Sequence, residues 1–187
     1  MDKSRNIHLN KNREIDVGII FAVVIFVMSI TYAVGGLFPF GGGLVSRGDM
    51  TQQTIPVMYH IWDVLHGKAS PLFTWNSGLG VNLTGASNLG AFYSPLNLFL
   101  YFTRRSAIPQ FANILVVIKI FFMALSMYLY LGKYKKSRVG VIIGSLLYAF
   151  GGASLVHYHI MMIMDAAFLF PLLMIGVDRI RNKGRLH

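Results

Sequence analysis

The chain has 187 residues, of which 55% are hydrophobic and 13% are charged, and its formal net charge is +10. This composition is far from that of a soluble domain. The positive charge lies at the ends of apolar runs, which argues against a nucleic-acid-binding surface, and the absence of cysteine excludes disulfides, thiolate metal sites and cysteine nucleophiles.

Twelve of the 17 basic residues form three clusters at alternate ends of four apolar runs. Cytoplasmic loops of membrane proteins carry an excess of Lys and Arg, so we expect every cluster to be cytoplasmic. The sequence therefore predicts a multi-pass protein of the plasma membrane with both termini of this chain in the cytoplasm. The clusters are Lys3, Arg5, Lys11 and Arg13; Lys133, Lys135, Lys136 and Arg138; and Arg179, Arg181, Lys183 and Arg185.

The chain begins with a basic segment, residues 1–16, which we expect to be a cytoplasmic tail. Residues 17–38 follow as an apolar run of about the 20 residues that cross a bilayer. A cleaved signal peptide is the alternative, but the run is long for a signal core and no convincing cleavage site follows it. We therefore predict a retained transmembrane helix.

Residues 39–108 form a long loop that we expect outside the cytoplasm. From about Thr54 its pattern becomes helical, and the resulting amphipathic helix would lie flat in the membrane interface. Its apolar stripe is Ile55, Met58, Tyr59, Trp62 and Leu65. A second apolar piece, Leu89 to Phe102, contains Pro95 and is too short to span, so it reads as re-entrant or interfacial.

Three more apolar runs complete an all-α integral membrane fold of four transmembrane helices with a long outer loop that contains interfacial helices. The remaining elements are predicted as a span at 109–131, a cytoplasmic loop at 132–138, a span at 139–156, an outer turn at 157–160, a span at 161–177 and a cytoplasmic basic end at 178–187.

Three charged residues stand out against this background. Lys119 lies in the middle of the second predicted span, and Asp165 lies near the outer end of the fourth, where a charge is costly unless it faces protein or water. The partner of Lys119 is open between a carboxylate of this chain, a segment outside it and a lipid phosphate; a purely structural Lys–Asp pair is an equal alternative. Asp49 follows the first span and precedes a helix, whose amide dipoles would stabilise it.

Several short motifs, in this order and spacing, resemble the bacterial YfhO-like membrane proteins, which are predicted glycosyltransferases of the multi-spanning GT-C type. Each motif is loose by itself, and their succession along the chain makes the resemblance specific. They are Arg47 to Gln53, Trp75 to Gly80, Tyr93 to Asn97, Lys119, Tyr148 to Gly152, and Met164-Asp165 leading into Phe170-Pro171-Leu172.

The resemblance implies transfer of a sugar from a polyprenyl-phosphate carrier in the membrane lipid to a cell-envelope polymer such as teichoic acid, on the outer face. It implies Asp49 as the catalytic residue, either a general base or a metal-linked carboxylate. Lys119 would meet the carrier phosphate. The remaining substrate-binding residues would be Arg47, Gln52, Gln53 and Asp165. The resemblance leaves a divalent metal open and implies no organic cofactor.

Members of this family are several times longer, so we expect the chain to be an amino-terminal portion of such a protein and the transfer activity to belong to the full-length protein. The alternative function is a non-catalytic lipid-carrier binding, transport or accessory subunit. In that case Lys119 and Asp165 would line a pathway, and Asp49 would only cap a helix.

Overall fold

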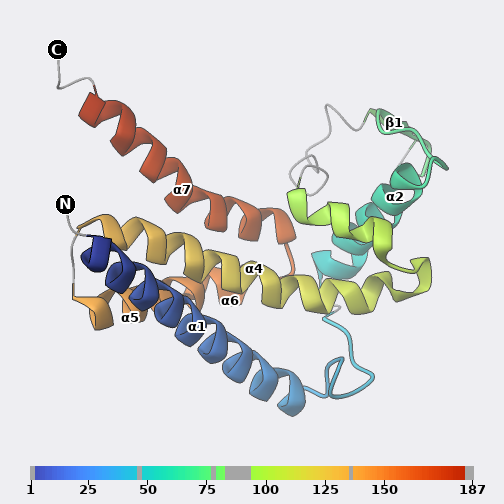
Figure 1. Cartoon of the computed structure of the whole chain (residues 1–187). Helices are drawn as coiled ribbons and strands as arrows, with labels where there is room; N and C mark the ends of the chain where they lie inside the picture. The colour runs from blue at the N-terminus through green and yellow to red at the C-terminus, as the bar shows by residue number, and fades with distance from the viewer. Residues whose placement is uncertain (1–2, 46–47, 77–78, 83–93, 135–136, 184–187) are drawn as a thin grey trace.

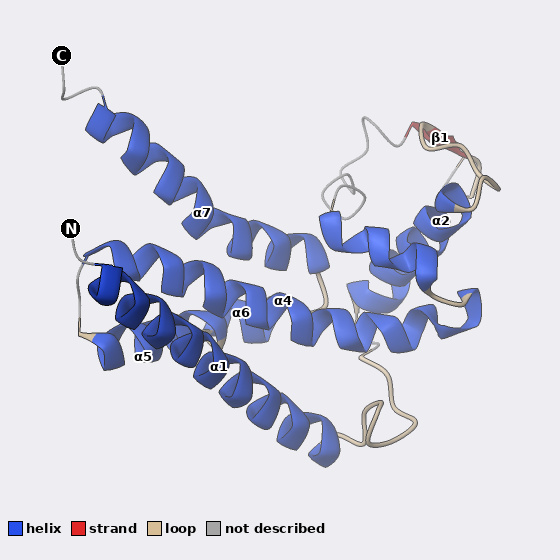
Figure 2. Cartoon of the chain, in the orientation of Figure 1, coloured by secondary structure: helices blue, strands red, loops and turns tan. Residues whose placement is uncertain are grey.

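The computed structural model describes residues 3–45, 48–76, 79–82, 94–134 and 137–183. Most of the described chain is helical (Figure 2). The strands are a short antiparallel ribbon of β1 (Phe73–Thr74) and β2 (Val81–Asn82). Part of the predicted second apolar piece, residues 89–93, lies outside the described residues.

Four helical stretches of the described chain are long and apolar enough to cross a membrane. This confirms the predicted all-α membrane fold. The stretches cover residues 12–34, 105–134, 138–157 and 161–181. They are built from α1 (Lys3–Val34), α4 (Ile108–Leu131), α5 (Arg138–Ala149) with α6 (Gly152–His157), and α7 (Met161–Lys183).

The third stretch is not one continuous helix. It is interrupted between α5 and α6, where Gly151 adopts an extended backbone conformation as the residue before α6. Glycine is a poor helix former, and the pair Gly151-Gly152 comes one residue after the end of α5. The pattern of apolar residues alone did not reveal this break, because it continues through Leu155 and Val156.

Helix α4 is the centre of the bundle and packs against α1, α5 and α7 (Figure 1). It is buried along its length, from Ile108 to Tyr128. The other spanning helices expose large apolar side chains, such as Phe26, Leu147 and Leu173, at 66%, 70% and 61%. An apolar exterior of this kind is stable when it faces lipid.

The long connection between α1 and α4 comprises residues 35–107, and its helix α2 (Ile55–Leu65) packs against α4. The other helical parts of its described residues are the π-helical turn η1 (Met50–Thr54) and the 3₁₀ segments η2 (Pro95–Phe102) and η3 (Arg105–Ala107). Helix α2 starts where the sequence predicts it, with Pro56 in its first turn. It packs on η2 through a stack of Trp62, His66 and Tyr101.

Asn113 of α4 is fully buried and attaches the glycine-rich part of this connection to the bundle. Its Oδ1 accepts a hydrogen bond from the Val45 amide at 2.8 Å, and its Nδ2 donates to the carbonyls of Phe38 and Gly43 at 3.3 and 3.4 Å. The Tyr32 hydroxyl donates to the Asn113 carbonyl at 2.8 Å. One side chain therefore satisfies three backbone groups of a loop that has little regular structure of its own.

Candidate functional site

Lys119 and Asp165 form a buried ion pair between α4 and α7. The Lys119 Nζ lies 2.6 Å from the Asp165 Oδ1 and also donates to the Met161 carbonyl at 3.1 Å. The side chains of Lys119 and Asp165 are 1% and 8% exposed. The sequence required a partner for Lys119 and left its identity open; in the structure it is a carboxylate of this chain.

The geometry follows from the start of α7. Met161 and Asp165 are four residues apart, so they lie on the same helix face, where the terminal carbonyl and the carboxylate can both reach one ammonium group. The Ser94 hydroxyl donates to the same Asp165 Oδ1 at 3.1 Å. Among the described residues, the buried Asp165 Oδ2 has no hydrogen-bond partner. This oxygen is therefore available to accept a hydrogen bond from a ligand hydroxyl or a water.

Asp49 occupies a different environment. It is half-buried at the residue before η1, and its side chain makes no capping hydrogen bond. Its alternative role as a helix cap is therefore not seen. Asp16, Asp63, Asp165 and Asp178 all form ion pairs. Asp49 is the aspartate within the described ranges that has none.

An open cavity of about 310 Å³ lies at Gly48, the residue before Asp49 in the sequence. It is lined by Gly48, Leu155, Val156, Tyr158 and His159. The turn between α6 and α7 is held against the Asp49 segment because the Thr54 hydroxyl donates to the His159 carbonyl at 3.2 Å. Two residues further on, Met161 accepts from Lys119. The same short turn therefore connects the cavity with the buried ion pair.

The structure does not assign the other predicted binding residues to either of these sites. Gln52 is exposed on η1, and Gln53 is half-buried and already engaged in an interaction. Arg47 lies outside the described residues. The structure thus joins Lys119 with Asp165, while Asp49 takes no part in that pair's hydrogen bonds.

A metal site is not evident in the described part of the chain, where no three His, Cys, Asp or Glu side chains gather to hold an ion. The metal-linked role of Asp49 stays a prediction. If a cation enters beside Asp49, its remaining ligands must be backbone or amide oxygens or come from outside the described ranges.

Asp63 of α2 forms an ion pair with Arg105. Its two carboxylate oxygens accept from the Arg105 guanidinium at 3.1 and 3.2 Å, and Arg105 also lies over the Tyr59 ring. The hydrogen bond from Arg105 is the main reason that the pKa of the Asp63 carboxyl is held below its usual value. No sequence pattern marks this pair, because its members are 42 residues apart.

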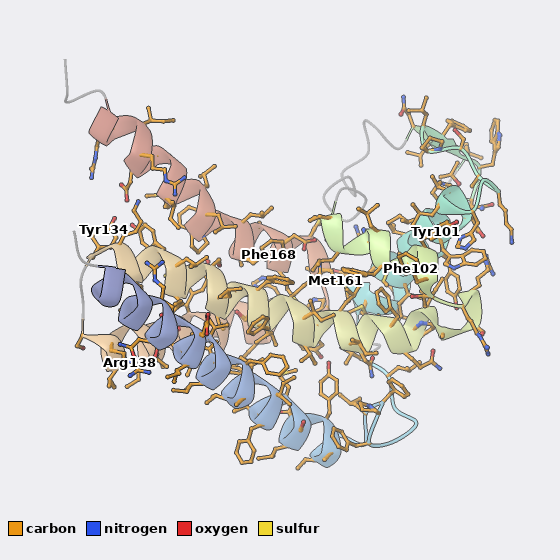
Figure 3. The ribbon with its side chains drawn as sticks, viewed as in Figure 1. Tyr101, Phe102, Tyr134, Arg138, Met161 and Phe168 are labelled. Atoms are coloured by element: carbon orange, nitrogen blue, oxygen red, sulfur yellow. The ribbon has the colours of Figure 1, made fainter. Side chains whose placement is uncertain are left out.

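Two further ion-pair groups lie at the opposite end of the bundle. Arg138 binds Asp16 at 2.6 Å, and the Tyr128 hydroxyl donates to the same carboxylate. Lys133 and the Tyr134 hydroxyl bind Asp178 at 3.2 and 2.8 Å. Figure 3 shows Tyr134 and Arg138 at this end and Tyr101 and Phe102 at the other, with Met161 and Phe168 between them.

The architecture and motifs agree with one known family. The model of the bacterial membrane protein YfhO matches residues 20–186. The chain belongs to the YfhO family. The match covers all but the beginning of the first spanning stretch and includes Asp49, Lys119 and Asp165. The resemblance predicted from the motifs is confirmed. A comparison with curated proteins and one with solved structures gave no match. Membership of this family supports a membrane location.

Proposed function

We propose that this member of the YfhO family forms part of a glycosyltransferase that uses a polyprenyl-phosphate-linked sugar at the outer face of the bacterial plasma membrane. The proposed acceptor is a cell-envelope polymer such as teichoic acid. The observation that carries the proposal is Asp49, a carboxylate without an ion-pair partner among the described residues, which directly follows Gly48 in the wall of an open cavity.

In the proposed reaction Asp49 accepts the proton of an acceptor hydroxyl. The hydroxyl oxygen then forms a bond to the anomeric carbon of the sugar, and the bond from that carbon to the carrier phosphate breaks. The electron pair of the broken bond leaves with the phosphate, which stays on the polyprenyl chain. Asp49 suits this task because no cation among the described residues neutralises it.

The 2.6 Å contact with Asp165 bears on the role of Lys119. Lys119 can meet a carrier phosphate only if it gives up a buried partner, which would leave a carboxylate uncompensated. We therefore propose that Lys119 and Asp165 are positioning residues. They fix the first turn of α7 and, through it, the cavity wall at His159.

The test is Asp49→Asn in the natural gene, followed by analysis of the sugar content of the envelope polymer. The substitution keeps the size of the side chain and removes no capping hydrogen bond. We expect at least the roughly hundredfold loss of transfer that is typical when general-base assistance is removed. Membrane abundance should stay unchanged.

Glu14→Gln is the matched control, because it also converts a carboxylate to an amide, on the exposed surface of α1. It should transfer sugar at the normal rate. Normal transfer by Asp49→Asn would reject the catalytic assignment and favour a non-catalytic lipid-carrier binding, transport or accessory role.

A further inference from the structure

The turn between α6 and α7 joins two stretches that are long enough to span the membrane. These stretches, residues 138–157 and 161–181, contain 20 and 21 residues. That is about the length of helix that crosses the hydrocarbon core of a bilayer. Tyr158 and His159 therefore lie at the level of a membrane surface, and in the predicted orientation this is the outer surface.

One wall of the cavity at this turn is apolar. It consists of Leu155 and Val156 of α6, and each of these residues is 61% exposed. Both belong to the third spanning stretch, so lipid is the medium that meets their exposed surfaces. A hydrocarbon chain in the membrane can therefore reach this wall without passing through water.

The rest of the cavity wall is formed by Gly48, Tyr158 and His159. The His159 carbonyl accepts a hydrogen bond from Thr54, and its ring makes an edge contact with the Tyr158 ring at 5.6 Å between centroids. The His159 ring nitrogens have no hydrogen-bond partner in the described part of the chain. A histidine ring donates through at least one nitrogen in either protonation state, so His159 can offer a donor to a ligand.

The position of His159 is fixed from three sides. The Thr54 hydroxyl holds its carbonyl at 3.2 Å, and Lys119 holds the Met161 carbonyl, two residues further on, at 3.1 Å. A side-chain carbon added at Gly48 would lie 3.8 Å from the His159 Cδ2, so the ring lies close to the start of the Asp49 segment. A donor that is placed before the ligand arrives loses less conformational freedom on binding.

These two walls suit a ligand that is polar and anionic at one end and apolar along the rest. The five lining residues include a hydrogen-bond donor and no carboxylate, which favours an anion over a metal cation. A free sugar would leave the apolar wall without a partner. A phosphate that carries a long hydrocarbon chain would use both walls.

We propose that this cavity holds the phosphate of a polyprenyl-phosphate carrier. The His159 ring donates a hydrogen bond to the phosphate, and the first isoprenyl units lie against Leu155 and Val156. This inference rests on the proposed sugar transfer and assigns the phosphate contact to His159. Lys119, whose ammonium group is already engaged by Asp165 at 2.6 Å, acts on the carrier only by holding the turn in place.

The test is equilibrium binding of radiolabelled farnesyl phosphate to protein from the natural gene, in nanodiscs of phosphatidylcholine. His159→Phe keeps an aromatic ring beside Tyr158 and removes the donor. We expect binding to weaken at least about tenfold, as for the loss of a hydrogen bond to a charged group. His159→Arg, which can donate to phosphate, should bind more tightly than His159→Phe. His60→Phe, at a half-buried histidine that does not line the cavity, should bind normally.

A second pair of variants tests the apolar wall and does not depend on the folding of His159→Phe. Leu155→Ala and Leu173→Ala both shorten an apolar side chain that is 61% exposed, and only Leu155 lines the cavity. Binding of farnesyl phosphate should weaken severalfold in Leu155→Ala and stay unchanged in Leu173→Ala. Equal binding by these two variants would overturn the proposal.

Competition separates the two parts of the ligand. Farnesol and inorganic phosphate should each displace farnesyl phosphate poorly. Displacement by inorganic phosphate at the same concentration as unlabelled farnesyl phosphate would indicate a site for soluble anions, and equal displacement by farnesol would indicate an apolar groove alone. Either result overturns the proposal, as does normal binding by His159→Phe. None of these results decides the sugar transfer, which the separate analysis of Asp49→Asn tests.

Discussion

The Tyr148 hydroxyl donates a hydrogen bond of 2.8 Å to the Ala167 carbonyl on the neighbouring helix. Ala167 is four residues before Pro171, which lies inside α7 and has no amide hydrogen to donate. Tyr148 therefore supplies the donor that the proline removes. The two belong to separate motifs, near the end of α5 and in the middle of α7, and this contact gives them a shared structural role.

This relationship predicts the effect of Tyr148→Phe. Loss of the hydroxyl leaves the Ala167 carbonyl without its donor and should lower the free energy of unfolding by about 1 kcal/mol. In a Pro171→Ala background the helix regains its own donor, so the same substitution should have a smaller effect. Unfolding by sodium dodecyl sulfate in mixed micelles measures both. An equal loss in the two backgrounds would contradict this interpretation.

The Lys119–Asp165 pair predicts a second, larger effect. Lys119→Met leaves a buried carboxylate uncompensated and should destabilise the protein by roughly 3–5 kcal/mol. The double variant Lys119→Met/Asp165→Leu removes both charges and should recover most of that loss. The same unfolding assay applies, with binding of a polyprenyl-phosphate carrier as a second measurement. A stable Lys119→Met protein that no longer binds the carrier would instead assign Lys119 to the phosphate.

The orientation of the chain predicts opposite labelling of two glycine positions. Gly42 and Gly132 both have open space where a side chain would lie, so Gly42→Cys and Gly132→Cys should fold normally. On intact cells an impermeant thiol reagent should label the first, beyond α1, and spare the second, beside the basic cluster at Lys133. Labelling of Gly132→Cys alone would invert the topology.

The Asp63–Arg105 pair predicts a dependence on pH. The pKa of Asp63 is lowered in the folded protein, so the pair contributes stability above the usual carboxyl pKa and loses it as the pH falls through the lowered value. Because Arg105 is exposed, the contribution should be small. A carboxyl titration followed by NMR should show the lowered pKa, and Arg105→Gln should return it towards its usual value. An unchanged titration in Arg105→Gln would show that another group lowers the pKa.

The spanning helices could be predicted because lipid imposes a simple rule on composition: long apolar runs bounded by basic clusters. The need for a partner at Lys119 followed from the same rule. Its identity did not, because Asp165 is 46 residues away and is brought close only by the packing of α7 on α4. The contacts of Asn113 could not be predicted either, because they depend on the folded position of the loop at residues 38–45. The interruption at Gly151 follows from the backbone preference of glycine, which a hydropathy pattern does not report.

The length of α4, 24 residues from Ile108 to Leu131, makes the chain responsive to bilayer thickness. In a membrane with shorter acyl chains, α4 would have to tilt or the lipid would have to stretch around it, at a fraction of a kcal/mol for each ångström of mismatch. Ser94 is linked to α4 through Asp165 and Lys119. Tilting would therefore move Ser94 and the start of η2 together with α4 and α7. The thickness of the surrounding bilayer should therefore affect the position of this segment relative to the membrane.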